Sequence, residues 1–331
     1  MEFRKLGKTD LNLSAITYGS FAIGGTMWAG SVKKDAQEAI LASIDNGITT
    51  LDTAPFYGFG FSEELIGETI KDLDRSKIQL LTKFGMVWDG SNKEKGDFMW
   101  NQEHEGKTYP IYKYASKANV IKEVEESLQR LKTDYIDLLQ LHWPDSTTPI
   151  EETMEALQRL IEQGKILAAG VSNYTAQQML EAQKSISLAS NQVPYSMLKR
   201  GIESKVIPTA IENEIGIIAY SPLERGLLSG KFFNGESLKS EDHRNGYFGQ
   251  FNLEKVKSFL ESIEPIAKDK QVSLSQLVLR WTTLQFGISI VLAGARNKEQ
   301  AVSNAKAIEV IISSDEMQFI NTELAKLSLN Q

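Results

Sequence analysis

The chain has 331 residues, and 41% of them are hydrophobic, which is enough for a large core. Its formal net charge of −7 argues against a nucleic-acid binder with a basic face, and the absence of cysteine excludes disulfides, thiolate metal sites and a cysteine nucleophile. The N-terminus has no signal-like apolar core, and no run approaches the roughly 18 apolar residues of a membrane span. We therefore expect a cytoplasmic protein without a membrane partner.

The N-terminal segment Phe3–Ser14 predicts a small β-hairpin that turns at Gly7 and Lys8 and closes one end of a barrel. Short apolar runs then alternate with helix-length amphipathic segments, and such runs are typical of parallel strands covered on both faces. The tail 313–327 predicts a final amphipathic helix outside this repeat. The eight expected strands are 15–18, 49–52, 78–83, 136–141, 167–171, 187–192, 215–220 and 288–292.

Two of the helices between these strands can be recognised from capping residues or from the spacing of apolar residues. One should begin with Thr148 as its N-cap and Pro149 in the first turn, followed by a glutamate three residues after the cap. In the helix before it, apolar residues recur at three- and four-residue spacing from Val120 to Leu131. Its acidic residues, including Glu123, are expected on an exposed face.

This order of elements fits a (β/α)8 TIM barrel, which we expect to be a single domain covering residues 1–331. A doubly wound sheet is the main competitor, but the turn after Tyr18 does not match the glycine pattern GxGxxG of such folds. Two long insertions, 84–117 and 224–251, would emerge as loops at the C-terminal rim, where barrel enzymes build their sites. We interpret the stretch 93–107 as a solvated loop.

Four polar residues lie at or just after the ends of strands two, three and four: Asp52, Tyr57, Lys83 and His142. Each of them alone is more commonly a cap, a half-buried aromatic or a surface charge. In a parallel barrel, however, their positions converge on one rim. A phenol has a reference pKa of about 10, which a nearby ammonium lowers, and a carboxylate would keep that ammonium charged. With a neutral imidazole to bind a carbonyl oxygen, the four predict a proton donor for carbonyl reduction.

The chain resembles the aldo-keto reductase superfamily, specifically its bacterial branch related to the potassium-channel β-subunits. The motifs that carry the resemblance occur in the family's order through nearly the whole chain. They are LDTAPFYGFGFSEELIGE (51–68), LLTKFG (80–85), SLQRLKTDYIDLLQLHWPD (127–145), GVSNY (170–174), YSPLERGLLSGK (220–231) and VLAGARNKEQAVSNAKA (291–307).

The resemblance implies a barrel that binds NADP(H), with Asp52, Tyr57, Lys83 and His142 as the catalytic tetrad. The reaction it implies is hydride transfer to an aldehyde or ketone, with Tyr57 protonating the oxygen, or the reverse oxidation of an alcohol. The residues implied to bind the cofactor are Ser20, Ser172, Asn173, Gln192, Tyr220, Ser221, Leu223, Gly226, Lys231, Arg244, Gly294, Arg296, Gln300 and Asn304. Independently of the resemblance, Asn297 and Gln300 predict a helix cap that offers free N–H groups to an anion, next to Arg296, which suits a phosphate.

Alternatives remain at this point. A catalytically slow, NADP(H)-binding regulatory subunit like the channel β-subunits would keep the same tetrad, but composition indicates no partner-binding patch. A metal-dependent hydrolase is disfavoured, because only Asp52 and His142 lie at strand ends as ligands, so no metal is expected. Four aromatic residues are expected to make the substrate pocket apolar: Phe21, Trp28, Trp88 and Trp143. The physiological substrate and the oligomeric state stay open.

Overall fold

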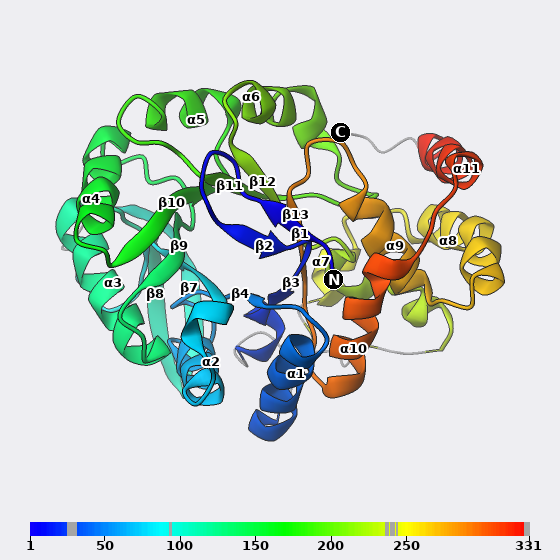
Figure 1. The fold of residues 1–331 in the computed structure, drawn as a ribbon, viewed down its shortest axis with the longest axis horizontal. Helices are drawn as coiled ribbons and strands as arrows, with labels where there is room; N and C mark the ends of the chain where they lie inside the picture. The colour runs from blue at the N-terminus through cyan, green and yellow to red at the C-terminus, as the bar shows by residue number, and fades with distance from the viewer. Residues whose placement is uncertain (25–31, 93–94, 236–237, 239–241, 243, 328–331) are drawn as a thin grey trace.

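The computed structural model of the chain describes residues 1–24, 32–92, 95–235, 238, 242 and 244–327. Eight parallel strands form a closed barrel in the order β10-β11-β12-β13-β3-β4-β5-β9 (Figure 1). The expected (β/α)8 barrel is therefore confirmed, and each expected strand overlaps an observed one. The barrel strands are β3 (Ile16–Gly19), β4 (Thr50–Asp52), β5 (Gln79–Phe84), β9 (Ile136–Leu141), β10 (Ile166–Ser172), β11 (Ser190–Pro194), β12 (Gly216–Tyr220) and β13 (Ile290–Ala293).

Helices surround the barrel (Figure 1), and their buried apolar residues pack with those of the strands. The start of one of them differs from the prediction by a residue: Pro149 is the N-cap, and the hydroxyl of Thr148 donates to Asp145 Oδ2 (2.6 Å) rather than capping the helix. No helix among the described residues is long and apolar enough to cross a membrane. The surrounding helices are α1 (Lys33–Asp45), α2 (Phe61–Ile70), α3 (Lys117–Leu131), α4 (Ile150–Glu162), α5 (Ala176–Ala182), α6 (Val206–Glu212), α9 (Leu274–Thr283) and α10 (Lys298–Lys306).

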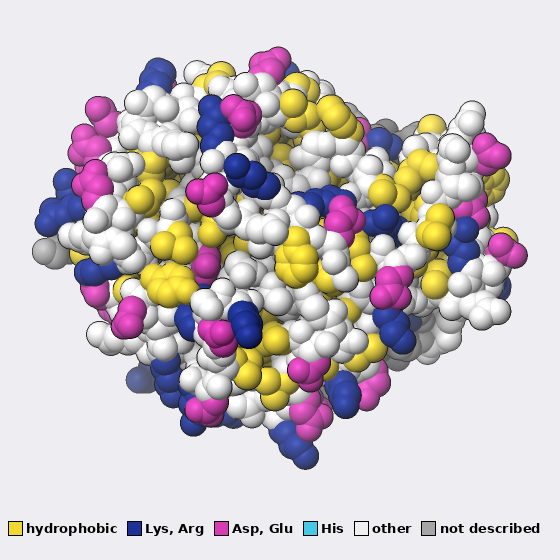
Figure 2. Space-filling view, in the orientation of Figure 1, with side chains coloured by type: hydrophobic (Ala, Val, Ile, Leu, Met, Phe, Trp, Pro, Cys, Tyr) yellow, Lys and Arg dark blue, Asp and Glu magenta, His cyan; other side chains and the backbone are white. Residues whose placement is uncertain are grey.

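The N-terminal hairpin closes one end of the barrel, as predicted. Strands β1 (Phe3–Lys5) and β2 (Asn12–Ser14) pair antiparallel, and the completely buried Leu6 and Leu13 pack with side chains from the barrel strands. A Cβ at Gly7, where φ is +52°, would lie 2.6 Å from the carbonyl oxygen of Glu214, so only glycine fits this turn. On the face that carries the hairpin, acidic and basic side chains are interspersed (Figure 2).

The described part of the insertion 84–117 forms a sheet, so the expectation of a solvated loop at 93–107 is wrong for the described residues of that stretch. Strands β6 (Met86–Val87), β7 (Asp97–His104) and β8 (Lys107–Lys113) form a three-stranded antiparallel sheet in the order β6-β8-β7. The two-residue turn between β7 and β8 has positive φ at both Glu105 (49°) and Gly106 (74°), which suits the twist of a tight hairpin. Aromatic side chains of this sheet pack against Phe56 and Phe59, which bracket Tyr57 in the loop after β4.

The insertion 224–251 contains the 3-10 turns η4 (Glu224–Ser229) and η5 (Lys231–Phe233) and the short helix α7 (Arg244–Phe248). Helix α8 (Leu253–Asp269) follows it. The expected last helix is present as α11 (Ser314–Ala325), and its start is a capping box between Ser313 and Glu316.

Candidate active site

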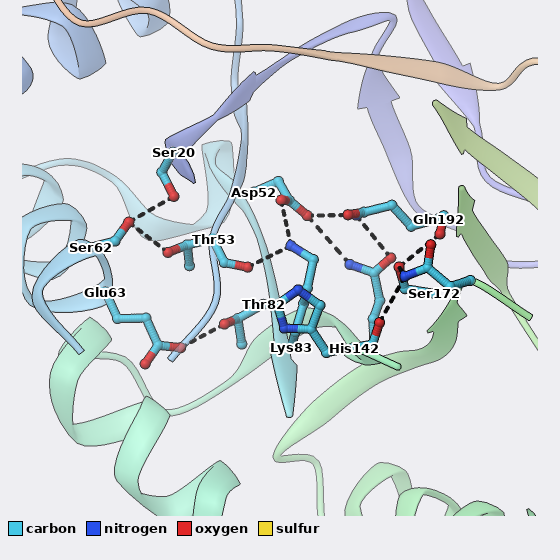
Figure 3. Close-up of polar contacts among 12 residues, drawn as sticks. Ser20, Asp52, Thr53, Ser62, Glu63, Thr82, Lys83, His142, Ser172 and Gln192 are labelled. Carbon is cyan, nitrogen blue, oxygen red and sulfur yellow. Dashed lines mark hydrogen bonds and ion pairs between the residues drawn. The ribbon is translucent and has the colours of Figure 1, made fainter. Parts of the chain in front are cut away.

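The structure brings the four predicted polar residues together at the C-terminal ends of the barrel strands. Lys83 Nζ donates to Asp52 Oδ1 at 2.6 Å and to the carbonyl oxygen of Thr53 at 2.9 Å (Figure 3). The Lys83 and Asp52 side chains are only 1% and 2% exposed. Burying two charges is costly unless they are paired and hydrogen-bonded, and this pair is both.

Tyr57 lies against this ion pair and against His142. The Lys83 ammonium is 5.0 Å from the centroid of the Tyr57 ring, and the His142 and Tyr57 rings meet edge to face with centroids 5.8 Å apart. Burial lowers the pKa of His142 well below its usual value, and the Lys83 charge adds to this effect, so the imidazole is neutral at pH 7. The prediction of a neutral imidazole is confirmed.

The sequence predicted a lowered pKa for the Tyr57 phenol, but in the structure this pKa is raised. Burial raises the pKa of Tyr57, and the charge of Lys83 opposes this rise without overcoming it. Burial also disfavours the charge on Lys83, but Asp52 and Tyr57 outweigh burial and hold the pKa of Lys83 above its usual value. At neutral pH the site therefore contains a protonated phenol beside a charged ammonium.

The second oxygen of Asp52 is held by amide groups from other strands. Gln192 Nε2, on β11, donates to Asp52 Oδ2 at 2.8 Å, and the Gln192 carbonyl oxygen accepts from the hydroxyl of Ser172 at 2.8 Å (Figure 3). Asn173 Nδ2 donates to the carbonyl oxygen of His142 at 3.1 Å, and Asn173 Oδ1 accepts from the hydroxyl of Tyr220 at 3.0 Å. Asn173 Nδ2 also donates to Ser172 Oγ at 3.1 Å, so one hydrogen-bond network joins β4, β5, β10, β11 and β12.

A cavity of about 540 Å³ is lined by Asp52, Tyr57 and His142. This volume lies in the range of ligand sites, roughly 300–1,000 Å³. Four basic side chains line the cavity, Arg225, Lys231, Arg244 and Arg296, whereas Asp52 is the sole acidic residue among its described lining. Arg244 is paired with Asp242 at 2.6 Å, but basic groups still outnumber acidic ones in the described lining, which suits an anionic ligand in a chain with a net charge of −7.

Most of the predicted site residues line this cavity, and the exceptions are informative. Lys83 is buried behind Tyr57 and Asp52. Ser20 does not line the cavity, since its side chain is completely buried and accepts from the hydroxyl of Ser62 at 2.7 Å. Trp88 packs on Phe59 with ring centroids 5.2 Å apart, also away from the cavity, and Trp28 lies outside the described residues. The predicted residues that do line it are Phe21, Asp52, Tyr57, His142, Trp143, Ser172, Asn173, Gln192, Tyr220, Ser221, Leu223, Gly226, Lys231, Arg244, Gly294, Arg296, Gln300 and Asn304.

Sequence reasoning missed several residues of the cavity wall. Trp100 belongs to the insertion sheet, and the strand-forming residues Phe98, Trp100, Tyr109, Ile111 and Tyr112 on either side of Glu105–Gly106 were the sequence signal that could have placed it. Arg225 has a left-handed φ of 56°, and its guanidinium lies 3.8 Å from the centroid of the Tyr247 ring. The missed lining residues are Gly19, Ala22, Phe56, Met86, Trp100, Pro222, Arg225, Ser229, Ser273, Ser275, Leu292, Ala293 and Ser303.

The predicted cap at the far end of the cavity is present. Asn297 is the N-cap of α10, and its side chain accepts from the backbone N–H of Gln300 at 3.0 Å. Gln300 Oε1 accepts in turn from the backbone N–H of Arg296, and Asn304 Nδ2 donates to the carbonyl oxygen of Gly294 at 3.1 Å. These bonds fix the segment on which Arg296 faces the cavity.

Glu123 is not on an exposed face of α3, as was expected, but is buried against the end of β5. Its carboxylate accepts from the backbone N–H of Gly85 at 3.0 Å and from the side-chain amide of Asn119. Burial raises the pKa of Glu123 to about 8, although the Gly85 hydrogen bond favours the charged form. Charge patterning alone does not reveal this contact, because it joins a side chain of α3 to the backbone at the end of β5.

The comparisons with known proteins agree with this geometry. The aldo/keto reductase family model matches residues 15–323. The chain is 37% identical over 329 residues to aldo-keto reductase YhdN of Bacillus subtilis (strain 168), covering 98% of this chain and 94% of that protein. It is 35% identical over 313 residues to the NADH-specific methylglyoxal reductase of Escherichia coli (strain K12), covering 93% and 94%.

A probable voltage-gated potassium channel subunit beta of Oryza sativa subsp. japonica is 29% identical over 322 residues, covering 94% of this chain and 92% of that protein. Among solved structures, a glycerol dehydrogenase from Gluconobacter oxydans superposes with a TM-score of 0.87 at 32% identity, covering 100% of this chain and 97% of that chain. The barrel, the converging polar residues and these matches lead to one conclusion: the chain belongs to the aldo/keto reductase family.

Proposed function

We propose that the protein is an NADP(H)-dependent reductase of aldehydes or ketones that uses Tyr57 as its proton donor. The observation that carries this proposal is the buried Lys83–Asp52 ion pair beside Tyr57 at the base of the cavity. A fully buried ammonium next to a phenol stabilises the phenolate that remains after the proton has left. The paired carboxylate keeps the ammonium charged for that task.

The arrangement supports a simple sequence of proton steps. The neutral imidazole of His142 donates a hydrogen bond to the carbonyl oxygen and orients it toward Tyr57. When bound, a nicotinamide cofactor supplies the hydride that forms the new C–H bond. Tyr57 gives its proton to the oxygen, and Lys83 balances the phenolate until solvent returns a proton. Burial raises the pKa of Tyr57, so the phenol still carries its proton at neutral pH, and the Lys83 charge opposes this rise and favours release of the proton during reduction.

The residues of the cavity wall suit nicotinamide adenine dinucleotide phosphate as a ligand. The four basic residues lie on the chain segments after β12 and β13, and Ser221, Ser229 and Ser273 line the same cavity. Arg296, beside the capped N-terminus of α10, presents a planar donor set for a 2′-phosphate. A relative at 35% identity is NADH-specific by name, so the preference of this chain for NADPH requires a direct measurement.

The carbonyl end of the cavity indicates the substrate class. Phe21, Phe56, Met86, Trp100 and Trp143 line it, and none of these side chains carries a charge. We therefore propose an aldehyde or ketone with an apolar body rather than a charged one.

Steady-state oxidation of NADPH with a panel of apolar, polar and charged aldehydes tests the proposal. We expect turnover that is fastest for the apolar members, and slower turnover with NADH at equal concentration. Tight NADPH binding without turnover of any aldehyde would instead favour a regulatory, cofactor-binding protein. The similarity to the rice channel subunit is the observation that supports a regulatory, cofactor-binding protein as the second candidate.

A further inference from the structure

A buried glutamine that the proposed mechanism does not use lies next to the tetrad. Gln140 is on β9, inside the barrel, where it is completely buried and pairs in register with Lys83 of β5. Its Nε2 donates to Asp52 Oδ2 at 3.5 Å, and its Oε1 accepts from Gln192 Nε2 at 3.3 Å. Gln140 therefore contacts both the Asp52 carboxylate and the Gln192 amide that holds it in place.

The barrel leaves room for this side chain at one specific position. Gly170 is the neighbour of Gln140 in register on β10. A Cβ at Gly170 would lie 3.1 Å from Gln140 Cγ and 2.4 Å from Ser190 Oγ, so a larger residue would push Gln140 away from its partners. Glycine is needed here for space and not for its backbone conformation.

We propose that Gln140 is a positioning residue that locks Gln192 and the Asp52 carboxylate, so that the other oxygen of Asp52 stays on Lys83. The catalytic part of this inference rests on the proposed function. The N–H donors hold the Asp52 carboxylate in place, and a fixed Asp52 beside Lys83 keeps the ammonium charged next to the phenol. The ionisable groups around Tyr57 are Lys83, Asp52, His142 and Tyr220, so the effect of Gln140 reaches Tyr57 through the ion pair.

The first test is a double-mutant cycle in unfolding, which needs neither cofactor nor turnover. Gln140→Met keeps the length of the side chain and removes its hydrogen bonds. We expect it to lower the urea midpoint in the wild-type background and to lower it much less when Asp52→Asn is already present. Gln79→Met is the matched control, because Gln79 bonds Thr49 and Thr50 at the other end of β5, and its effect should be equal in both backgrounds. Equal effects of Gln140→Met in both backgrounds would overturn the proposal.

The second test is the pH profile of alcohol oxidation, in which the Tyr57 phenolate accepts the proton of the alcohol. In Gln140→Met we expect the midpoint to move to higher pH by about one unit and kcat of reduction to fall about tenfold. A purely structural role would lower the rate without moving the midpoint, as we expect for Gln79→Met. An unshifted midpoint in a folded, active variant also overturns the proposal.

Two further outcomes are informative. If Gln140→Met does not fold, Gln140→Asn replaces it in both tests, because it keeps a buried amide that is one methylene too short to reach Asp52. If neither variant folds while Gln79→Met does, Gln140 is a structural residue and the positioning role is rejected. If the wild-type protein reduces no carbonyl, the proposed function fails, whereas the unfolding cycle still tests the contact of Gln140 with Asp52.

Discussion

Breaking the Asp52–Lys83 ion pair should destabilise the fold far more than breaking an ion pair on the surface. In Asp52→Asn the Lys83 ammonium stays buried with the carbonyl oxygen of Thr53, 2.9 Å away, as its remaining strong partner. Leaving one charge of a buried pair uncompensated costs about 3–5 kcal/mol of unfolding free energy. The loss should appear as a lower midpoint in urea denaturation at pH 7, followed by tryptophan fluorescence.

A matched exposed pair provides the control. Lys34 and Glu38 lie 3.8 Å apart on α1 with side chains 81% and 50% exposed, so Glu38→Gln should cost no more than about 0.5 kcal/mol. The double variant Asp52→Leu/Lys83→Met removes both buried charges and should recover most of the loss while abolishing turnover. The reasoning is refuted if Asp52→Asn costs no more than Glu38→Gln, or if the double variant is less stable than Asp52→Asn.

Three other changes test separate parts of the site. Tyr57→Phe should lower kcat by about 10²–10⁴-fold and leave the Kd of NADPH nearly unchanged. The control Tyr112→Phe, on the insertion sheet, should change neither value. Similar rates in the two variants would show that Tyr57 is not the acid. Arg296→Ala should raise the Kd of NADPH by about 10- to 100-fold, measured by fluorescence titration, and an equal loss for NADH would contradict the contact with the 2′-phosphate. The folded pKa of Glu123 is about 8 and lies above its unfolded value, so the stability it contributes is full below about pH 4.5 and is lost as pH rises through 8. Glu123→Gln should therefore reduce the pH dependence of the urea midpoint between pH 5 and 9, and parallel curves for variant and wild type would refute the buried-acid assignment.

The parts of the fold that follow from local patterns could be predicted from the sequence. Alternating apolar runs and amphipathic helices predicted the barrel, the hairpin was found where its turn residues indicated, and the last helix where its amphipathic pattern indicated. The insertion 84–117 was misjudged, because its glycine and charged residues suggested a loop, while the strand-forming aromatic residues on either side of Glu105–Gly106 pair as a hairpin. The start of α4 differed by one residue, since Asp145 competes for the hydroxyl of Thr148.

For the site, position along each strand was enough to bring Asp52, Tyr57, Lys83 and His142 to one rim, because the carboxyl ends of parallel barrel strands meet there. Burial was not predictable in the same way. The Tyr57 phenol is so well enclosed that desolvation outweighs the Lys83 charge, and Glu123 turns inward to meet Gly85.

The sequence by itself determined the order of the barrel strands and the residue types at their ends, because both depend on local periodicity and on chain direction. Only the tertiary structure decided which side chains contact across the barrel. Gln140 and Gln192 reach Asp52 from strands that are 88 and 140 residues away in the chain, and Trp100 reaches the cavity from an insertion sheet. Such contacts depend on closure of the barrel and on the space beside Gly170, which no local pattern encodes.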